Sequence, residues 1–262
     1  MEAEQQTDQP LAVQAEDLHK SYGDNHVLKG VSFEVKPGEV FVLMGPSGSG
    51  KSVLLKQIIG LEAPDQGRVR INGLDAADQE THEKFKTALV FQAGALFNSM
   101  SVFDNLALYL REHRMYDEKT IRDKVKRVLQ VLSIEQTAKQ FPASLSGGMR
   151  KRVAVARAIV MEPQLILYDE PTSELDPIRA ATVSELIATV RDETNVTSIV
   201  VSHDKDLAKG IADRVGLLWD GELIFNGTRE EFTSSEDDRV RDFLNPTINP
   251  SNPRFRQQRN SA

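Results

Sequence analysis

The chain has 262 residues, of which 40% are hydrophobic and 27% charged, an ordinary globular composition with room for one large or two small domains. The formal net charge of −7 excludes the broad basic footprint of a general nucleic-acid-binding protein, so we expect no nucleic-acid partner. The absence of cysteine excludes disulfides, thiolate zinc sites and cysteine nucleophiles.

The N-terminal segment is polar and acidic and does not have the pattern of a signal or transit peptide, so residues 1–10 are expected to form a flexible leader. Apolar runs along the chain are strand-sized, well below the ~20 residues that span a bilayer. We therefore expect a soluble, intracellular protein whose connection to a membrane runs through a partner.

A single ordered domain is expected over residues 11–245. Short alternating runs between Leu11 and Gly38 predict antiparallel strands. The run "EVFVLM" predicts a buried strand that leads through a glycine-rich segment into an apolar helix, with Gly60 as its stop. The segment "GRVRINGLDA" then predicts a further strand and turn.

Residues 94–158 have helical character and are expected to form an insertion in the core. Within it, "TIRDKVKRVLQVLSI" places apolar side chains on one face at helical spacing. These residues are Ile121, Val125, Val128, Leu129 and Leu132.

The C-terminal third alternates buried strands with helices. "QLILYDEP" and "TSIVVSHD" predict buried strands, "DPIRAATVSELIATVRDE" predicts an amphipathic helix, and "RVGLLWDGELIFNGT" predicts a hairpin turning at Asp220 and Gly221. This order predicts an α/β fold with a parallel sheet covered on both faces. Residues 246–262 are rich in proline and asparagine, so a flexible tail is expected.

The segment "GPSGSGKS" lies between a predicted strand and a predicted helix, which is the context of a phosphate-binding P-loop. Glycines let the backbone wrap a phosphate chain, and the helix N-terminus adds partial positive charge. Lys51 is expected to reach the β- and γ-phosphates, and Ser52 to ligate Mg²⁺. The nucleotide-binding segment comprises Gly45, Pro46, Ser47, Gly48, Ser49, Gly50, Lys51, Ser52 and Val53.

Polar side chains follow other predicted strands, at the sheet edge where open α/β folds bind ligands. Asp169 is expected to hold Mg²⁺ through water, and Glu170 to orient and polarise the attacking water. His203 is placed to contact the γ-phosphate or that water. Gln92 is placed to bond Mg²⁺ or the water through its amide oxygen. Tyr22 is either a stacking face for adenine or an aromatic of the core.

These pieces, in this order, resemble the ATP-binding-cassette ATPases from about Leu11 to Thr228. The resemblance implies a P-loop NTPase (RecA-like) core, an antiparallel β subdomain, an inserted helical subdomain, and ATP with Mg²⁺ as cofactors. It also implies a head-to-tail dimer in which the "LSGG" turn of one copy closes over ATP held by the other copy. In this chain the turn contributes Ser146, Gly147, Gly148 and Met149, and Asp176 belongs to the loop that links the two sites.

The chain departs from the family pattern at three positions. Met149 replaces a usual glutamine, but its backbone N–H is retained, so intact catalysis is expected. Val53 replaces a usual threonine where Ser52 already supplies the hydroxyl. Glu174 stands in "SELD" where "SALD" is commoner, and its carboxylate would repel the γ-phosphate unless it points outward.

The segments "LSGGM", 91–113 and 237–244 resemble the ATPase subunits of bacterial Mla/Mce-type lipid transport systems. That likeness implies an integral membrane permease, a Mce-type substrate-binding subunit, and a peripheral place on the cytoplasmic face of the inner membrane. A polar-solute importer or exporter, and a non-transport ATPase such as a cluster-assembly factor, remain alternatives.

Three further segments leave alternatives open. The apolar residues of "GALFNSMSVF" either form a groove for a permease helix or pack into the helical subdomain; they are Leu96, Phe97, Met100 and Phe103. The basic run 150–152 is expected to be a solvated face rather than a membrane-binding one. Phe243, Leu244 and Phe255 are expected in a disordered tail rather than docked on a second copy.

Overall fold

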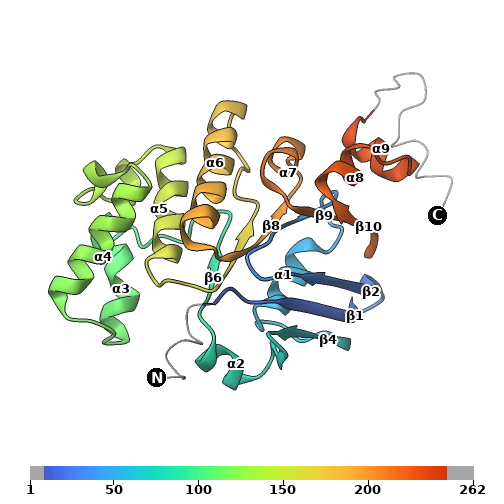
Figure 1. The fold of residues 1–262 in the computed structure, drawn as a ribbon, viewed down its shortest axis with the longest axis horizontal. Coiled ribbons are helices and arrows are strands. Elements are labelled where there is room, and N and C mark those ends of the chain that lie inside the picture. The colour runs from blue at the N-terminus through green and yellow to red at the C-terminus, as the bar shows by residue number, and fades with distance from the viewer. Residues whose placement is uncertain (1–8, 247–262) are drawn as a thin grey trace.

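The computed structural model describes residues 9–246. The antiparallel strands expected near the N-terminus are confirmed, and they form a four-stranded sheet in the order β2-β1-β4-β5. Its strands are β1 (Val13–Tyr22), β2 (Asn25–Val35), β4 (Gln66–Ile71) and β5 (Leu74–Asp75). In Figure 1 this layer lies along the bottom of the molecule.

The central sheet has six strands in the order β10-β9-β3-β8-β7-β6. Its strands are β3 (Val40–Met44), β6 (Thr87–Val90), β7 (Leu165–Asp169), β8 (Thr197–Ser202), β9 (Arg214–Trp219) and β10 (Glu222–Thr228). Neighbouring strands are parallel except for β9 and β10, which form the expected hairpin. Asp220 and Gly221 both have positive φ, 55° and 83°, as a two-residue type I′ turn requires.

The central sheet is buried on both faces, as predicted from its uninterrupted apolar runs. On β3, Val42 and Met44 face the helical layer, whereas Phe41 and Leu43 face the antiparallel sheet. The cover on that second face is α1 (Lys51–Ile58) together with the antiparallel sheet, rather than helices alone.

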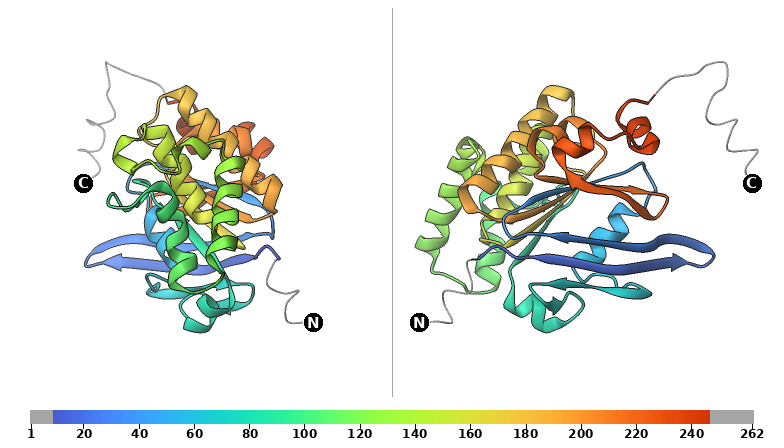
Figure 2. Two further views of the ribbon diagram at one scale, coloured as in Figure 1. Left: turned by 90° about the vertical axis from the view of Figure 1, so that its left-hand side faces the viewer. Right: turned by 45° about the vertical axis from the view of Figure 1, so that its right-hand side comes forward.

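Helices cover the first face and extend beyond one end of the sheet (Figures 1 and 2). The helical segment contains α3 (Val102–Glu112), α4 (Glu118–Val131) and α5 (Gly147–Ile159). The face predicted for α4 is confirmed, because Ile121, Val125 and Leu129 are buried. The remaining helices are α2 (Gln79–Lys84), α6 (Pro177–Thr194), α7 (Lys205–Ile211), α8 (Arg229–Thr233) and α9 (Asp238–Leu244). Short 3-10 turns at Glu135–Thr137 and Pro142–Ser144 complete the helical segment.

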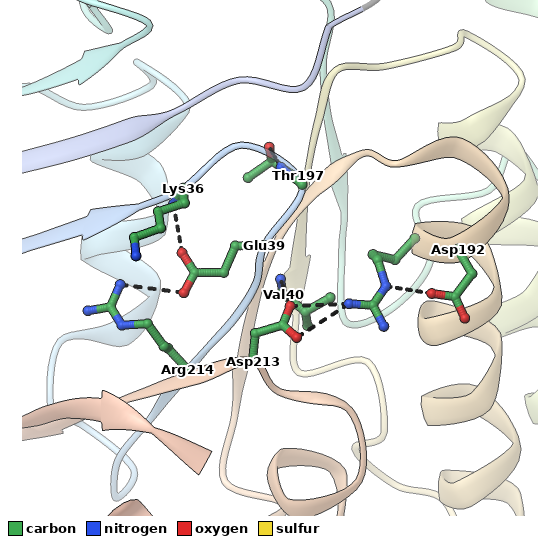
Figure 3. A network of polar contacts seen from close by, with 9 residues as sticks. Lys36, Glu39, Val40, Asp192, Thr197, Asp213 and Arg214 are labelled. Atoms are coloured by element: carbon green, nitrogen blue, oxygen red, sulfur yellow. Dashed lines mark hydrogen bonds and ion pairs between the residues drawn. The ribbon is translucent and has the colours of Figure 1, made fainter. Parts of the chain in front are cut away.

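A polar network fixes the amino ends of the central strands (Figure 3). Asp213 accepts a hydrogen bond from the Val40 N–H at 2.8 Å and pairs with Arg191 at 3.2 Å. Buried Glu39 accepts from the Lys36 N–H at 2.6 Å and lies 3.4 Å from the Arg214 guanidinium. These contacts hold the sheet at the end opposite to the carboxyl ends of its parallel strands, so the network stabilises the scaffold and leaves the other edge open.

The two ends of the chain lie largely outside the described residues. The leader expected over 1–10 is described only at its last two positions, where Gln9 O accepts from Gln164 Nε2 at 2.9 Å. The tail expected over 246–262 lies outside the described part after Pro246, and so does Phe255. Leu244 is buried in the α9 helix and Phe243 packs against the same core, so the expectation of disorder is wrong for these two residues.

Candidate functional site

The P-loop runs from the end of β3 into α1 and needs glycine where the backbone approaches another strand. Gly45 has φ of 156°, and a Cβ there would lie 2.2 Å from the Leu218 carbonyl oxygen of β9. At Gly50, φ is 102° and a Cβ would lie 3.0 Å from Val27 O of β2. Any other residue would push the loop away from the two strands that shape it.

The first turn of α1 presents free donors and a buried cation. Within residues 9–246, no acceptor is recorded for the N–H groups of Lys51, Ser52 and Val53. The Lys51 ammonium donates to the carbonyls of Gly45 and Pro46 at 2.8 and 2.9 Å. Burial lowers the Lys51 pKa, against the opposing charges of nearby carboxylates. Free N–H groups, a helix N-terminus and a desolvated lysine together form an anion site.

Two carboxylates lie opposite this anion site at the carboxyl end of β7. Glu170 Oε1 lies 3.9 Å from Lys51 Nζ, and its Oε2 lies 2.9 Å from His203 Nδ1. Glu170 has φ of 47°, in the left-handed region, while its N–H still pairs with Val201 O at 2.9 Å. The fold thus brings Lys51, Glu170 and His203 from three separate segments into one contact chain, as their strand-end positions predicted.

Asp169 presents a buried carboxylate oxygen at the carboxyl end of β7. Its Oδ1 is buried and lacks a hydrogen-bond partner within the described residues. Burial raises the Asp169 pKa, and the neighbouring Glu170 charge raises it further. Within residues 9–246 no cluster of three or more His, Cys, Asp or Glu side chains could hold a metal by itself. Ser52, Gln92 and Asp169 would be the residues that hold Mg²⁺ beside bound phosphates, where the ion would neutralise their charge.

Gln92 and Tyr22 lie outside the contact chain of Lys51, Glu170 and His203. Gln92 is exposed just beyond β6, and its backbone carbonyl accepts a hydrogen bond from Lys151 Nζ. Tyr22 is 48% exposed at the end of the β1–β2 hairpin, so the core alternative is wrong. Its hydroxyl donates to Glu62, and its ring lies 5.7 Å from Lys20 Nζ. Stacking of adenine on this ring stays a prediction.

The "LSGG" turn forms the N-terminus of α5 and repeats the design of the first anion site. Ser146 is the N-cap residue, and its Oγ accepts from the Met149 N–H at 3.3 Å. The N–H groups of Gly147 and Gly148 have no acceptor in the described part of the chain. No hydrogen bond or ion pair among residues 9–246 links this turn to the P-loop of the same copy.

Replacing Met149 with glutamine tests whether the departure from the family pattern matters. The Ser146 hydroxyl caps α5 by accepting from the Met149 N–H, which glutamine keeps, and the thioether only packs against the helical core. We expect Met149→Gln to change the steady-state ATPase rate by less than about tenfold, or ~1.4 kcal/mol. An increase in the ATPase rate above ~100-fold would show that methionine at this position strongly impairs hydrolysis in the parent chain.

The loop after β7 positions Asp176 and Glu174 differently. Asp176 is the N-cap of α6 and accepts from the Arg179 N–H at 3.0 Å. Glu174 is exposed with φ of 62°, and its charge opposes the burial-lowered pKa of Lys151. The charge that Glu174 influences in this way is thus a lysine of α5 in the same copy.

A family model described as ABC transporter matches residues 28–173. The chain belongs to the ABC transporter family. As an ABC ATPase subunit it hydrolyses ATP, and its phosphate-binding loop lies inside the matched segment.

Relatives and solved structures agree with this assignment over most of the chain. The probable ribonucleotide transport ATP-binding protein mkl of Mycobacterium leprae is 41% identical over 90% of this chain and 69% of its own. The intermembrane phospholipid transport system ATP-binding protein MlaF of Haemophilus influenzae is 38% identical over 88% of this chain and 89% of its own. A dimeric ATP-binding cassette in a post-hydrolysis state with ADP and Pi has a TM-score of 0.73 and 32% identity, covering 83% and 98%.

The ABC ATPase has one contact in its site that the sequence patterns did not reveal. Lys151 contacts Gln92 from α5, although its place in a basic run suggested a solvated side chain. This contact needs the fold to be known, because 59 residues separate the two partners in sequence. None of the helices between residues 9 and 246 is both long and apolar enough to cross a bilayer.

Proposed function

We propose that this chain is the ATP-hydrolysing subunit of a bacterial transporter that moves phospholipids or related hydrophobic molecules between the inner membrane and the outer envelope. The similarity to MlaF carries the proposal, because it covers nearly the whole of both chains. The segments "LSGGM", 91–113 and 237–244 support the same branch of the family.

In this proposal, two copies associate head to tail on ATP and separate after hydrolysis. The P-loop of one copy holds the phosphates through Lys51 and free N–H groups. The Ser146 turn of the other copy supplies a second helix N-terminus to the same γ-phosphate. Glu170, held by His203, orients the attacking water and takes up its proton.

The permease is proposed to dock on a groove beside Gln92. This groove encloses about 550 Å³, and its lining includes Leu61, Phe91 and Phe97. These three side chains are 66%, 47% and 45% exposed, so apolar surface is available for a helix of a partner. Leu96 and Phe103 pack against the helical core instead, so the packing alternative holds for these two residues and docking is proposed only for the exposed Phe97.

Replacing Phe97 with aspartate tests this docking surface. A carboxylate at an apolar interface would lose the contact and be costly to desolvate, so we expect Phe97→Asp to abolish co-purification with the permease. ATP binding should be unchanged, because Phe97 lies outside the P-loop. Phe141→Asp, which alters an exposed aromatic outside the groove, is the control. Retained assembly in Phe97→Asp would count against the surface.

The similarity to mkl favours a polar solute as the second candidate cargo. The two candidates differ in their membrane partners. We expect the native complex, which would lie on the cytoplasmic face of the inner membrane, to contain an integral permease and a Mce-type substrate-binding subunit. Mass spectrometry of that complex should find bound phospholipid. A permease complex without such a subunit and without lipid would contradict the proposal.

A further inference from the structure

Helix α5 carries a row of side chains that contacts the Gln92 segment along its length. Lys151, Ala154 and Arg157 are spaced three residues apart, so they follow one ridge of the helix. Lys151 Nζ donates to the backbone oxygen of Gln92, and Arg157 donates to that of Ala95 at 2.5 Å. The two cations thus hold both ends of the segment 92–95.

The middle of the ridge allows the segment to lie close to the helix. Gly94 is buried with φ of 79°, and a Cβ there would lie 3.4 Å from the Ala154 Cβ. Ala95 also has a positive φ of 45°. Gly94 and Ala95, both with left-handed backbone, therefore form a tight turn that packs on Ala154, the smallest side chain of the ridge. A loose surface loop would need neither the left-handed backbone nor the small side chain.

Lys151 is not a solvated lysine, so the expectation of a solvated face over 150–152 is wrong at its central residue. Its side chain is half-buried, and burial lowers its pKa, against the charges of Glu174, Glu170 and Asp169. The neighbouring Arg150 donates to the Leu145 carbonyl at 2.6 Å, so it also serves the turn at the start of α5.

We propose that Lys151 is a positioning residue for ATP hydrolysis that acts through Gln92, with Arg157 as its second anchor. Helix α5 begins at the Ser146 turn, so the hydrogen bonds from Lys151 and Arg157 connect Gln92 to the same helix that carries this turn. A shift of the groove at Phe97, which stacks on Arg157, moves Gln92 and the turn together. The inference concerns the turnover of ATP and does not depend on the cargo.

The main test is steady-state ATP hydrolysis by the full chain carrying Lys151→Met. We expect kcat to fall about 10- to 100-fold, because a misplaced catalytic group loses rate, while KM for ATP stays within about threefold. Lys151→Arg should recover most of the rate, since a guanidinium can donate to the same oxygen. Lys126→Met, which alters an exposed lysine of α4, is the matched control and should leave both constants unchanged.

A double substitution decides whether Lys151 acts through Gln92. In Gln92→Ala the carbonyl remains but the amide is gone, so adding Lys151→Met should cost little more rate. Losses that multiply instead would overturn the proposal. A fall in kcat that tracks a fall in melting temperature, without rescue by arginine, would also overturn it. If Gln92→Ala alone leaves kcat unchanged, Lys151 cannot act through Gln92, and the proposal is overturned.

Arg157→Met gives an independent measurement on the second anchor. We expect the same pattern as for Lys151→Met, a lower kcat with a nearly unchanged KM, because the far end of the segment 92–95 is released. Arg127→Met on α4 is the matched control, since it removes an exposed guanidinium of the same subdomain. An unchanged kcat in a folded Arg157→Met chain would overturn the two-anchor arrangement.

Discussion

Glu170→Gln is expected to lower kcat for ATP hydrolysis by about 10²–10⁴-fold, the range that a positioned general base contributes. The side chain is only 15% exposed, and its two oxygens lie against Lys51 and His203. Glutamine keeps the size of the side chain but cannot take up a proton. ATP binding should persist, because the Lys51 contacts to Gly45 and Pro46 and the free N–H groups of α1 are unchanged.

Two quantities are measured: the rate of phosphate release at saturating ATP, and, by light scattering, the mass of the ATP-bound pair of copies. In Glu170→Gln, ATP should hold two copies together for longer than in the parent, because the step that separates them is blocked. Glu193→Gln, at an exposed position of α6, controls for the loss of one charge. A variant that keeps more than about a tenth of the parental rate would remove Glu170 from the role of base.

The sequence was sufficient to predict those residues of the site whose positions follow directly from the order of the strands. Asp169, Glu170 and His203 follow buried runs, and parallel strands end at one sheet edge, so their meeting with Lys51 was predictable. The distances between these side chains were not predictable, because a glutamate in the sequence does not indicate the left-handed backbone that Glu170 adopts. The free N–H groups at Ser146 were predictable in the same way, since a serine before two glycines is a helix N-cap pattern.

Contacts between segments remote in sequence were not predictable from local pattern. Lys151 lay in a basic run that suggested solvent, and only the packing of α5 beside β6 brings it to Gln92. Helices α7, α8 and α9 were not predicted either. They are short and charge-rich, so their helical conformation depends on tertiary packing rather than on periodicity. Tyr22 had two open alternatives because exposure at a hairpin end cannot be read from spacing.

Asp169→Asn is expected to separate stability from activity. Burial raises the folded-state pKa of Asp169 above its ordinary value of 3.8, so the ionised carboxylate disfavours the fold. The sign follows by linkage, because the folded state holds the proton more tightly than the unfolded state. Stability is therefore lost as pH rises from the ordinary pKa through the raised folded-state pKa, and the full penalty is present above the folded-state value. Asparagine removes that charge.

We expect the nucleotide-free Asp169→Asn chain to melt at a higher temperature than the parent at pH 7, where ~1 kcal/mol is worth about 2–4 °C. The gain should shrink as pH falls toward 3.8, the ordinary pKa value of an aspartate. Asp123→Asn, at an exposed position of α4, should show neither effect. A nucleotide-free variant that is no more stable than the parent would show that the buried charge is compensated.

The same substitution should remove the response to Mg²⁺. The unpartnered Oδ1 of Asp169 is the oxygen that an ion would neutralise, and asparagine offers it no charge. In the parent, MgATP at 100 times its Kd adds about 2.7 kcal/mol to the free energy of unfolding. In Asp169→Asn that gain should fall toward the gain with ATP alone, and kcat should fall by about 10²-fold or more. If the buried charge of Asp169 serves to hold an ion, one substitution should both raise the melting temperature of the nucleotide-free chain and remove its response to Mg²⁺. An unchanged MgATP shift would place the ion elsewhere.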